Sequence, residues 1–133
     1  MRQFVFGCLV VLAVASAAAA TLTPQKETIL SAGTSRTYYT LVPEKITAPV
    51  PLLLLLHGSG RDGMSQIDAW KDLAEKERIL LVAPDSANSR NWVFGTDGPE
   101  FLHDVIEAVR SRYSVDGRRI YIFGHSAGAT FAL

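Results

Sequence analysis

One serine near the end of the sequence lies in a pattern that suits nucleophilic chemistry. Residues 124–128 read Gly-His-Ser-Ala-Gly, and they directly follow the apolar segment 120–123. In this G-x-S-x-G pattern the serine lies on a sharp turn between a strand and a helix, which exposes its hydroxyl as a nucleophile. Ser126 is therefore the candidate catalytic residue. Gly124 and Gly128 are expected because side chains there would collide with the neighbouring strand and helix.

A serine nucleophile also needs hydrogen-bond donors for the negative charge that develops on the substrate oxygen. The helix expected after Ser126 would present the Ala127 amide at its N-terminus. A second donor is expected from residues 57–60, His-Gly-Ser-Gly, which follow a run of five leucines. We place this donor at the Ser59 amide, with Gly58 as the alternative. An ordinary strand-to-helix turn would also explain these glycines.

The general base and the catalytic acid are harder to find. His57 is expected to brace its own loop, His103 to lie on a helix surface, and His125 to point away from Ser126. Three aspartates before the serine are expected to be loop and capping residues: Asp62, Asp85 and Asp97. In enzymes with this turn the acid and the histidine follow the serine, and residues 127–133 contain neither. We therefore expect the chain to stop before its catalytic acid and histidine.

The elements that must position Ser126 follow a regular order. A β-hairpin is expected over residues 27–42, and short solid apolar runs then alternate with helical patterns. The expected strands and helices are, in order, strand 50–56, helix 64–78, strand 79–83, helix 100–113 and strand 119–123. Because helical crossovers return the chain in the same direction, these strands should be parallel. The predicted fold class is α/β, a doubly wound, mostly parallel sheet with an antiparallel N-terminal edge.

Two connecting segments carry further expectations. Residues 85–99 are expected to form a long loop that carries Trp92, and residues 115–117 are expected to form a turn. For Trp92, packing beneath the loop is favoured over contact with a substrate.

The first twenty residues read as a secretory signal peptide. Arg2 precedes an apolar run over residues 4–15, and small residues follow up to Ala20. We expect cleavage after Ala20, residues 21–133 as the N-terminal portion of one domain, and a secreted or periplasmic protein. An uncleaved membrane anchor is the alternative, although the run is short for a membrane span. No stable membrane anchor is expected after cleavage.

Composition excludes several classes of protein. The chain has 133 residues, enough for one small domain, and 13 basic residues balance 13 acidic ones, so no nucleic-acid partner is expected. Cys8 is the only cysteine and lies in the signal segment, so neither a disulfide nor a thiolate metal site is expected in the mature chain. Neither a metal nor a cofactor is expected.

Several segments together resemble secreted esterases of the polyhydroxybutyrate depolymerase and feruloyl/acetylxylan esterase group. They are residues 38–43, 51–58, 80–84, 113–121 and 124–128, of which Tyr-Ser-Val-Asp-Gly-Arg-Arg-Ile-Tyr at 113–121 is the most specific. The resemblance implies an α/β-hydrolase fold, of which this chain would be the N-terminal part only. One departure is Thr-Asp-Gly-Pro-Glu at 96–100, where members commonly have an Asp-Asp-Val-like run.

The resemblance also implies a reaction, a serine esterase mechanism through a covalent acyl-enzyme. Ser126 would attack the carbonyl of a small-molecule or polymeric ester, and the Ala127 and Ser59 amides would hold the oxyanion. Two alternatives stay open. One is a serine peptidase of the same fold, and the other is an inactive, truncated pseudo-enzyme or a binding protein that kept the scaffold.

Overall fold

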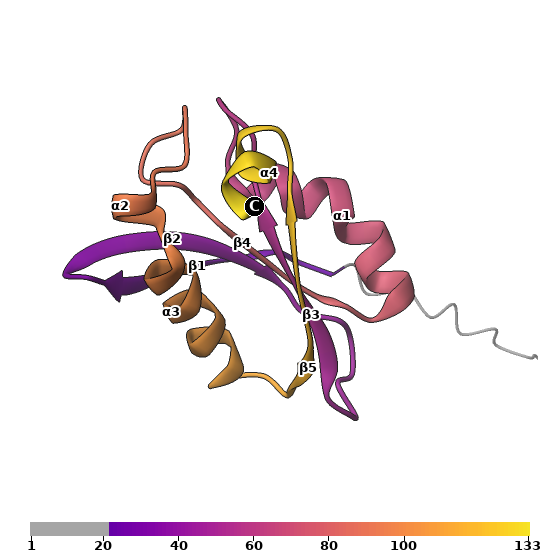
Figure 1. The fold of residues 1–133 in the computed structure, drawn as a ribbon. Coiled ribbons are helices and arrows are strands. Elements are labelled where there is room, and N and C mark those ends of the chain that lie inside the picture. The colour runs from indigo at the N-terminus through magenta and orange to yellow at the C-terminus, as the bar shows by residue number, and fades with distance from the viewer. Residues whose placement is uncertain (1–21) are drawn as a thin grey trace, which may run out of the picture.

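A computed structural model describes residues 22–133, so the expected signal peptide at residues 1–20 lies outside the described residues. The strands and helices follow in this order: β1 (Gln25–Ser31), β2 (Thr34–Leu41), β3 (Val50–Leu56), α1 (Gly63–Glu77), β4 (Leu80–Pro84), α2 (Phe94–Asp97), α3 (Pro99–Arg110), β5 (Val115–Gly124) and α4 (Ala127–Ala132). This is the expected hairpin followed by alternating strands and helices (Figure 1).

The sheet has the strand order β1-β2-β4-β3-β5. β2 pairs with β1 and with β4 in antiparallel fashion, whereas β3 pairs with β4 and with β5 in parallel. Among the described strands, β2 alone therefore runs against the common direction. The doubly wound, mostly parallel sheet with an antiparallel N-terminal hairpin is confirmed.

β3 lies between two parallel strands and is buried on both faces. Successive side chains of a strand point to opposite faces, so Leu52, Leu54 and Leu56 enter one core cluster, while Leu55 enters the other. This double burial explains why the segment reads as a continuous apolar run without polar alternation. It is also why its leucines form a strand here despite their helix propensity.

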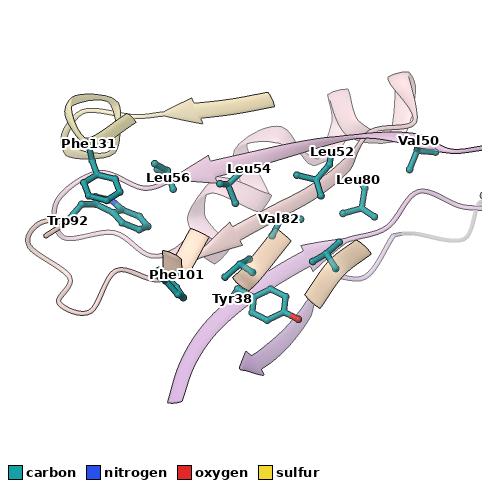
Figure 2. Close-up of a cluster of buried hydrophobic side chains, with 12 residues drawn as sticks. Tyr38, Val50, Leu52, Leu54, Leu56, Leu80, Val82, Trp92, Phe101 and Phe131 are labelled. Carbon is teal, nitrogen blue, oxygen red and sulfur yellow. The ribbon is translucent and has the colours of Figure 1, made fainter. Parts of the chain in front are cut away.

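Helices cover both faces of the sheet. Ile67 and Ala74 of α1 pack with residues of one face, and α3 and α4 contribute apolar side chains to the other. Figure 1 shows α1 and α3 on opposite sides of the strands. The cluster on the face covered by α3 and α4, drawn in Figure 2, combines strand residues with Phe101 of α3 and Phe131 of α4. The result is a three-layer α/β/α arrangement.

α1 begins with a side-chain cap. Asp62 has extended backbone geometry, and its Oδ1 accepts a hydrogen bond from the Ser65 amide at 2.9 Å. Such a cap satisfies one of the free amides of the first helical turn. The expected capping role of Asp62 is confirmed.

β5 starts earlier than the sequence indicates. It begins at Val115, which pairs with Val50, while the next pair joins Ile120 to Leu52. The extra β5 residues between these pairs form a bulge, in which the Arg118 amide donates to Asp116 Oδ1 at 2.9 Å. The turn expected at 115–117 is thus part of a bulge inside the strand. Its polar turn residues masked the strand signal.

The loop expected over residues 85–99 contains the short helix α2, and α3 ends at Arg110, three residues before the expected end. Between residues 22 and 133, no helix is both long and apolar enough to cross a membrane.

Candidate active site

Ser126 lies at the turn between β5 and α4 with a rarely populated backbone geometry. Its φ is +51° and its ψ is −115°. A non-glycine residue in such a region costs about 1–3 kcal/mol and persists only when its surroundings enforce it. Here the His125 amide donates to the Leu56 carbonyl at 3.0 Å, and the Ala129 amide donates to the Ser126 carbonyl at 2.9 Å. The first bond fixes the turn to the end of β3, and the second joins it to the start of α4. The Ser126 side chain is exposed.

The two glycines of the motif lie against backbone atoms. A Cβ at Gly124 would lie 2.3 Å from the Gly128 carbonyl carbon, and a Cβ at Gly128 would lie 2.3 Å from the Leu56 carbonyl oxygen. Both distances are far below a van der Waals contact, and the atoms met are backbone that cannot rotate away. Neither position therefore has room for a side chain.

Loop 57–60, which follows β3, lies beside Ser126. A Cβ placed on Gly58 would be 2.8 Å from His125 Nδ1 and 3.4 Å from Ser126 Cβ. No acceptor among residues 22–133 is recorded for the amides of Gly58, Ser59 or Ala127. The amides named as candidate oxyanion donors are thus available on two segments that meet at Ser126.

His57 is committed to holding this loop. The ring is buried, its Nε2 accepts the Ser86 amide at 3.1 Å, and its Nδ1 lies 2.9 Å from the Gly58 carbonyl. Because an amide donates to Nε2, that nitrogen is an acceptor, which leaves Nδ1 to face the Gly58 carbonyl as a donor. Both nitrogens are occupied, as the expected bracing role requires. His103 and His125 are exposed.

Trp92 packs beneath loop 57–60. Its indole Nε1 donates to the His57 carbonyl at 2.8 Å, and the side chain is only 8% exposed. The centroid of its ring lies 4.9 Å from that of the His57 ring. The Trp92 ring also stacks on Phe131 of α4, with 5.4 Å between ring centroids (Figure 2). The packing role expected for Trp92 is confirmed.

Asp85 is a loop residue, as expected, whereas Asp97 is the last residue of α2 and not a loop residue. Asp85 Oδ1 accepts the Gly63 amide at 2.8 Å. Asp97 is completely buried and forms an ion pair with Arg36 of β2, with 2.5 Å between Arg36 Nη2 and Asp97 Oδ1. The sequence alone did not predict this pair. Alternation along β2 carried a signal, since it places Arg36 on the same face as the buried Tyr38 and Thr40.

In the described part of the chain, no group of three or more His, Cys, Asp or Glu side chains could hold a metal ion. Beside Ser126, the described residues present an exposed hydroxyl and unpaired backbone amides.

Comparison with curated proteins identifies two relatives, although no protein-family model matches the chain. A bifunctional acetylxylan esterase/xylanase of Neocallimastix patriciarum is 29% identical over 103 residues, which cover 74% of this chain and 15% of that protein. Poly(3-hydroxyalkanoate) depolymerase C of Paucimonas lemoignei is 24% identical over an alignment of 141 positions, which covers 96% of this chain and 34% of that protein. The chain thus spans about a third or less of each relative.

Solved structures share the fold. The acetyl xylan esterase of Aspergillus awamori superposes with a TM-score of 0.71 at 17% identity, over 82% of this chain and 44% of that one. The poly(3-hydroxybutyrate) depolymerase of Bordetella parapertussis gives 0.68 at 22% identity, over 83% and 45%. A ferulic acid esterase gives 0.64 at 18% identity, over 80% and 51%. The chain therefore contains part of an α/β-hydrolase fold and resembles the polyhydroxybutyrate depolymerase and feruloyl/acetylxylan esterase group.

Proposed function

We propose that this chain carries the nucleophile of a serine hydrolase that cleaves carboxylic esters, with Ser126 as that nucleophile. The observation that carries the proposal is the strained Ser126 backbone, with φ of +51°, at a strand-to-helix turn. Strain of this kind is typical of functional sites. The unpaired amides of loop 57–60 beside it support the same conclusion.

The proposed reaction has two stages. Ser126 Oγ attacks the ester carbonyl, the Ala127 and Ser59 amides stabilise the oxyanion, and the alcohol leaves to give an acyl-enzyme. Water then attacks the acyl group and releases the carboxylic acid and the free serine. The serine proton must pass to a histidine base that an acid orients. Residues 127–133 contain neither, and we propose that both come from sequence beyond this chain.

The substrate class is proposed by analogy with the similar proteins. These are an acetylxylan esterase/xylanase and depolymerases of polymeric hydroxyalkanoates. A small-molecule or polymeric carboxylic ester is therefore the proposed substrate, and its acyl group is bound covalently during turnover.

We also propose that residues 1–20 are a signal peptide and that residues 21–133 form the N-terminal portion of a secreted or periplasmic hydrolase domain. The charged start, the apolar run and the small residues before Thr21 support this proposal. Intact mass of the exported protein checks it, and retention of Met1 would contradict it.

The test of the function uses the longest open reading frame that encodes this chain. Ser126→Ala should lower hydrolysis of p-nitrophenyl acetate by several orders of magnitude, because the acyl-enzyme forms on the Ser126 hydroxyl. Ser111→Ala, an exposed serine at the end of α3, is the matched control and should keep wild-type turnover. A fluorophosphonate should label the wild type and not Ser126→Ala. If Ser126→Ala keeps a tenth of the turnover, Ser126 is not the nucleophile.

A further inference from the structure

A buried ion pair joins β2 to the end of α2. Arg36 and Asp97 have side-chain exposures of 9% and 0%. The guanidinium carbon lies 3.6 Å from the centroid of the Phe101 ring, and Nη1 donates to the Thr96 carbonyl at 2.6 Å. Desolvation of two charges offsets much of their attraction, so a buried pair is weak evidence for a stabilising role alone. The other hydrogen bonds of Arg36 and Asp97 indicate a second role, which concerns the loop over residues 85–93.

The pair holds both ends of loop 85–93. Asp97 Oδ1 accepts the Ala87 amide, and Asp97 Oδ2 accepts the Val93 amide, each at 2.8 Å. Arg36 Nη2 also donates to the Asp85 carbonyl at 3.1 Å. Charge-assisted bonds of this kind are stronger than those between neutral groups. The ion pair therefore fixes the path of loop 85–93 relative to the sheet.

Loop 85–93 in turn holds loop 57–60 through hydrogen bonds, three of which have a backbone or indole N–H as the donor. They run from the Ser86 amide to His57 Nε2 at 3.1 Å, from Trp92 Nε1 to the His57 carbonyl at 2.8 Å, and from the Gly60 amide to the Ser89 carbonyl at 2.5 Å. Loop 57–60 contains two glycines and few bonds of its own, so its position depends on this support.

We propose that Arg36 and Asp97 are positioning residues, which act through loop 85–93 to hold loop 57–60 at the correct place beside Ser126. This inference rests on the proposed function, because it concerns the placement of the second oxyanion donor. Such a donor works only when it is aimed at the position that the oxyanion takes in the transition state. A misplacement of about 1 Å can cost on the order of a hundredfold in rate.

The test compares the Asp97→Asn and Asp97→Leu variants of the protein encoded by the longest open reading frame that contains this chain. Asparagine removes the charge but keeps an acceptor for one loop amide, whereas leucine removes both. We expect kcat to fall about tenfold for asparagine and up to about a hundredfold for leucine, with KM nearly unchanged, because the lost interaction acts in the transition state. Glu107→Gln, in the exposed ion pair with Arg110, is the matched control and should keep wild-type kcat.

A second readout needs no turnover. In a Trp70→Phe background, Trp92 is the remaining tryptophan of residues 1–133. Its emission, taken as the difference from the same protein carrying Trp92→Phe, should shift to longer wavelength in both Asp97 variants as loop 85–93 loosens. Measurements are made well below the melting temperature of each variant. If Asp97→Leu does not fold, Asp97→Asn decides the outcome by the same two readouts.

The outcomes separate the two proposals. A normal kcat in the folded Asp97 variants, beside an inactive Ser126→Ala, would overturn the inference alone and leave the pair as a source of stability only. Turnover that survives Ser126→Ala would overturn the proposed function and the catalytic part of the inference together. A lowered kcat with a shifted Trp92 emission supports the positioning role.

Discussion

The Ser126 backbone shows how single residues are constrained by their neighbours. Its positive φ is maintained because Gly124 and Gly128 let β3, β5 and α4 approach one another within backbone contact distance. Sterics alone explain the two glycines of the motif, since a sharp strand-to-helix turn has no room for side chains. The sequence could predict the conformation of this turn because most of the contacts that fix it lie within a few residues of Ser126. The end of β3 supplies the others.

Gly128→Ala should destabilise the protein strongly. The new methyl group would lie 2.3 Å from the Leu56 carbonyl oxygen, so α4 must move away from β3, at a cost of about 3 kcal/mol or more. Urea unfolding of the protein encoded by the longest open reading frame measures this loss of stability. Gly95→Ala is the control, because a Cβ there meets nothing within 4 Å, and its effect should stay within about 0.5 kcal/mol. Equal stability of the two variants would contradict the close packing of α4 on β3.

At the scale of elements, the apolar runs were sufficient to predict the three parallel strands and the two long helices. Local periodicity reports which face of an element is buried, and β3 and β4 are each buried on both faces. The ion pair between Arg36 and Asp97 could not be predicted in this way. Its partners lie 61 residues apart, and nothing local selects one aspartate among several as the partner of a strand arginine.

The cap of α1 gives a prediction for a whole element. Asp62→Ala removes the acceptor of the Ser65 amide, and it should lower the free energy of unfolding by about 1 kcal/mol. Asp62→Ser keeps a capping oxygen and should retain most of the stability. Chemical denaturation of both variants measures the difference. If serine costs as much as alanine, the side chain of residue 62 does not cap the helix.

The whole molecule has an apolar face that the described elements leave uncovered. β5 is the last strand of the described sheet, and Tyr121, Ile122 and Phe123 are 55%, 49% and 36% exposed. An open groove beside it is lined mainly by apolar residues of α3, β5 and α4, among them Leu102 and Phe131. α4 has six residues, too few for a helix to be stable without packing partners.

Residues 21–133 made alone should therefore fail to fold cooperatively. An unpaired apolar strand edge favours association with other chains, and the short α4 leaves apolar side chains of β5 uncovered. We expect aggregation, or a compact state that binds a hydrophobic dye, with no esterase turnover. Thermal unfolding and amide NMR spectra are the measurements. A sharp thermal transition with dispersed amide signals would contradict this expectation.

The central place of β3 has a consequence for the time course of synthesis. β3 ends at Leu56, but its second neighbour β5 is complete only at Gly124. At about 5–20 residues per second, a ribosome needs roughly 3–14 s to make the chain between these two positions. Until β4 is complete at Pro84 both edges of the strand are unpaired, and one edge stays unpaired until Gly124. The five leucines are therefore a hydrophobic segment that a nascent-chain chaperone would recognise.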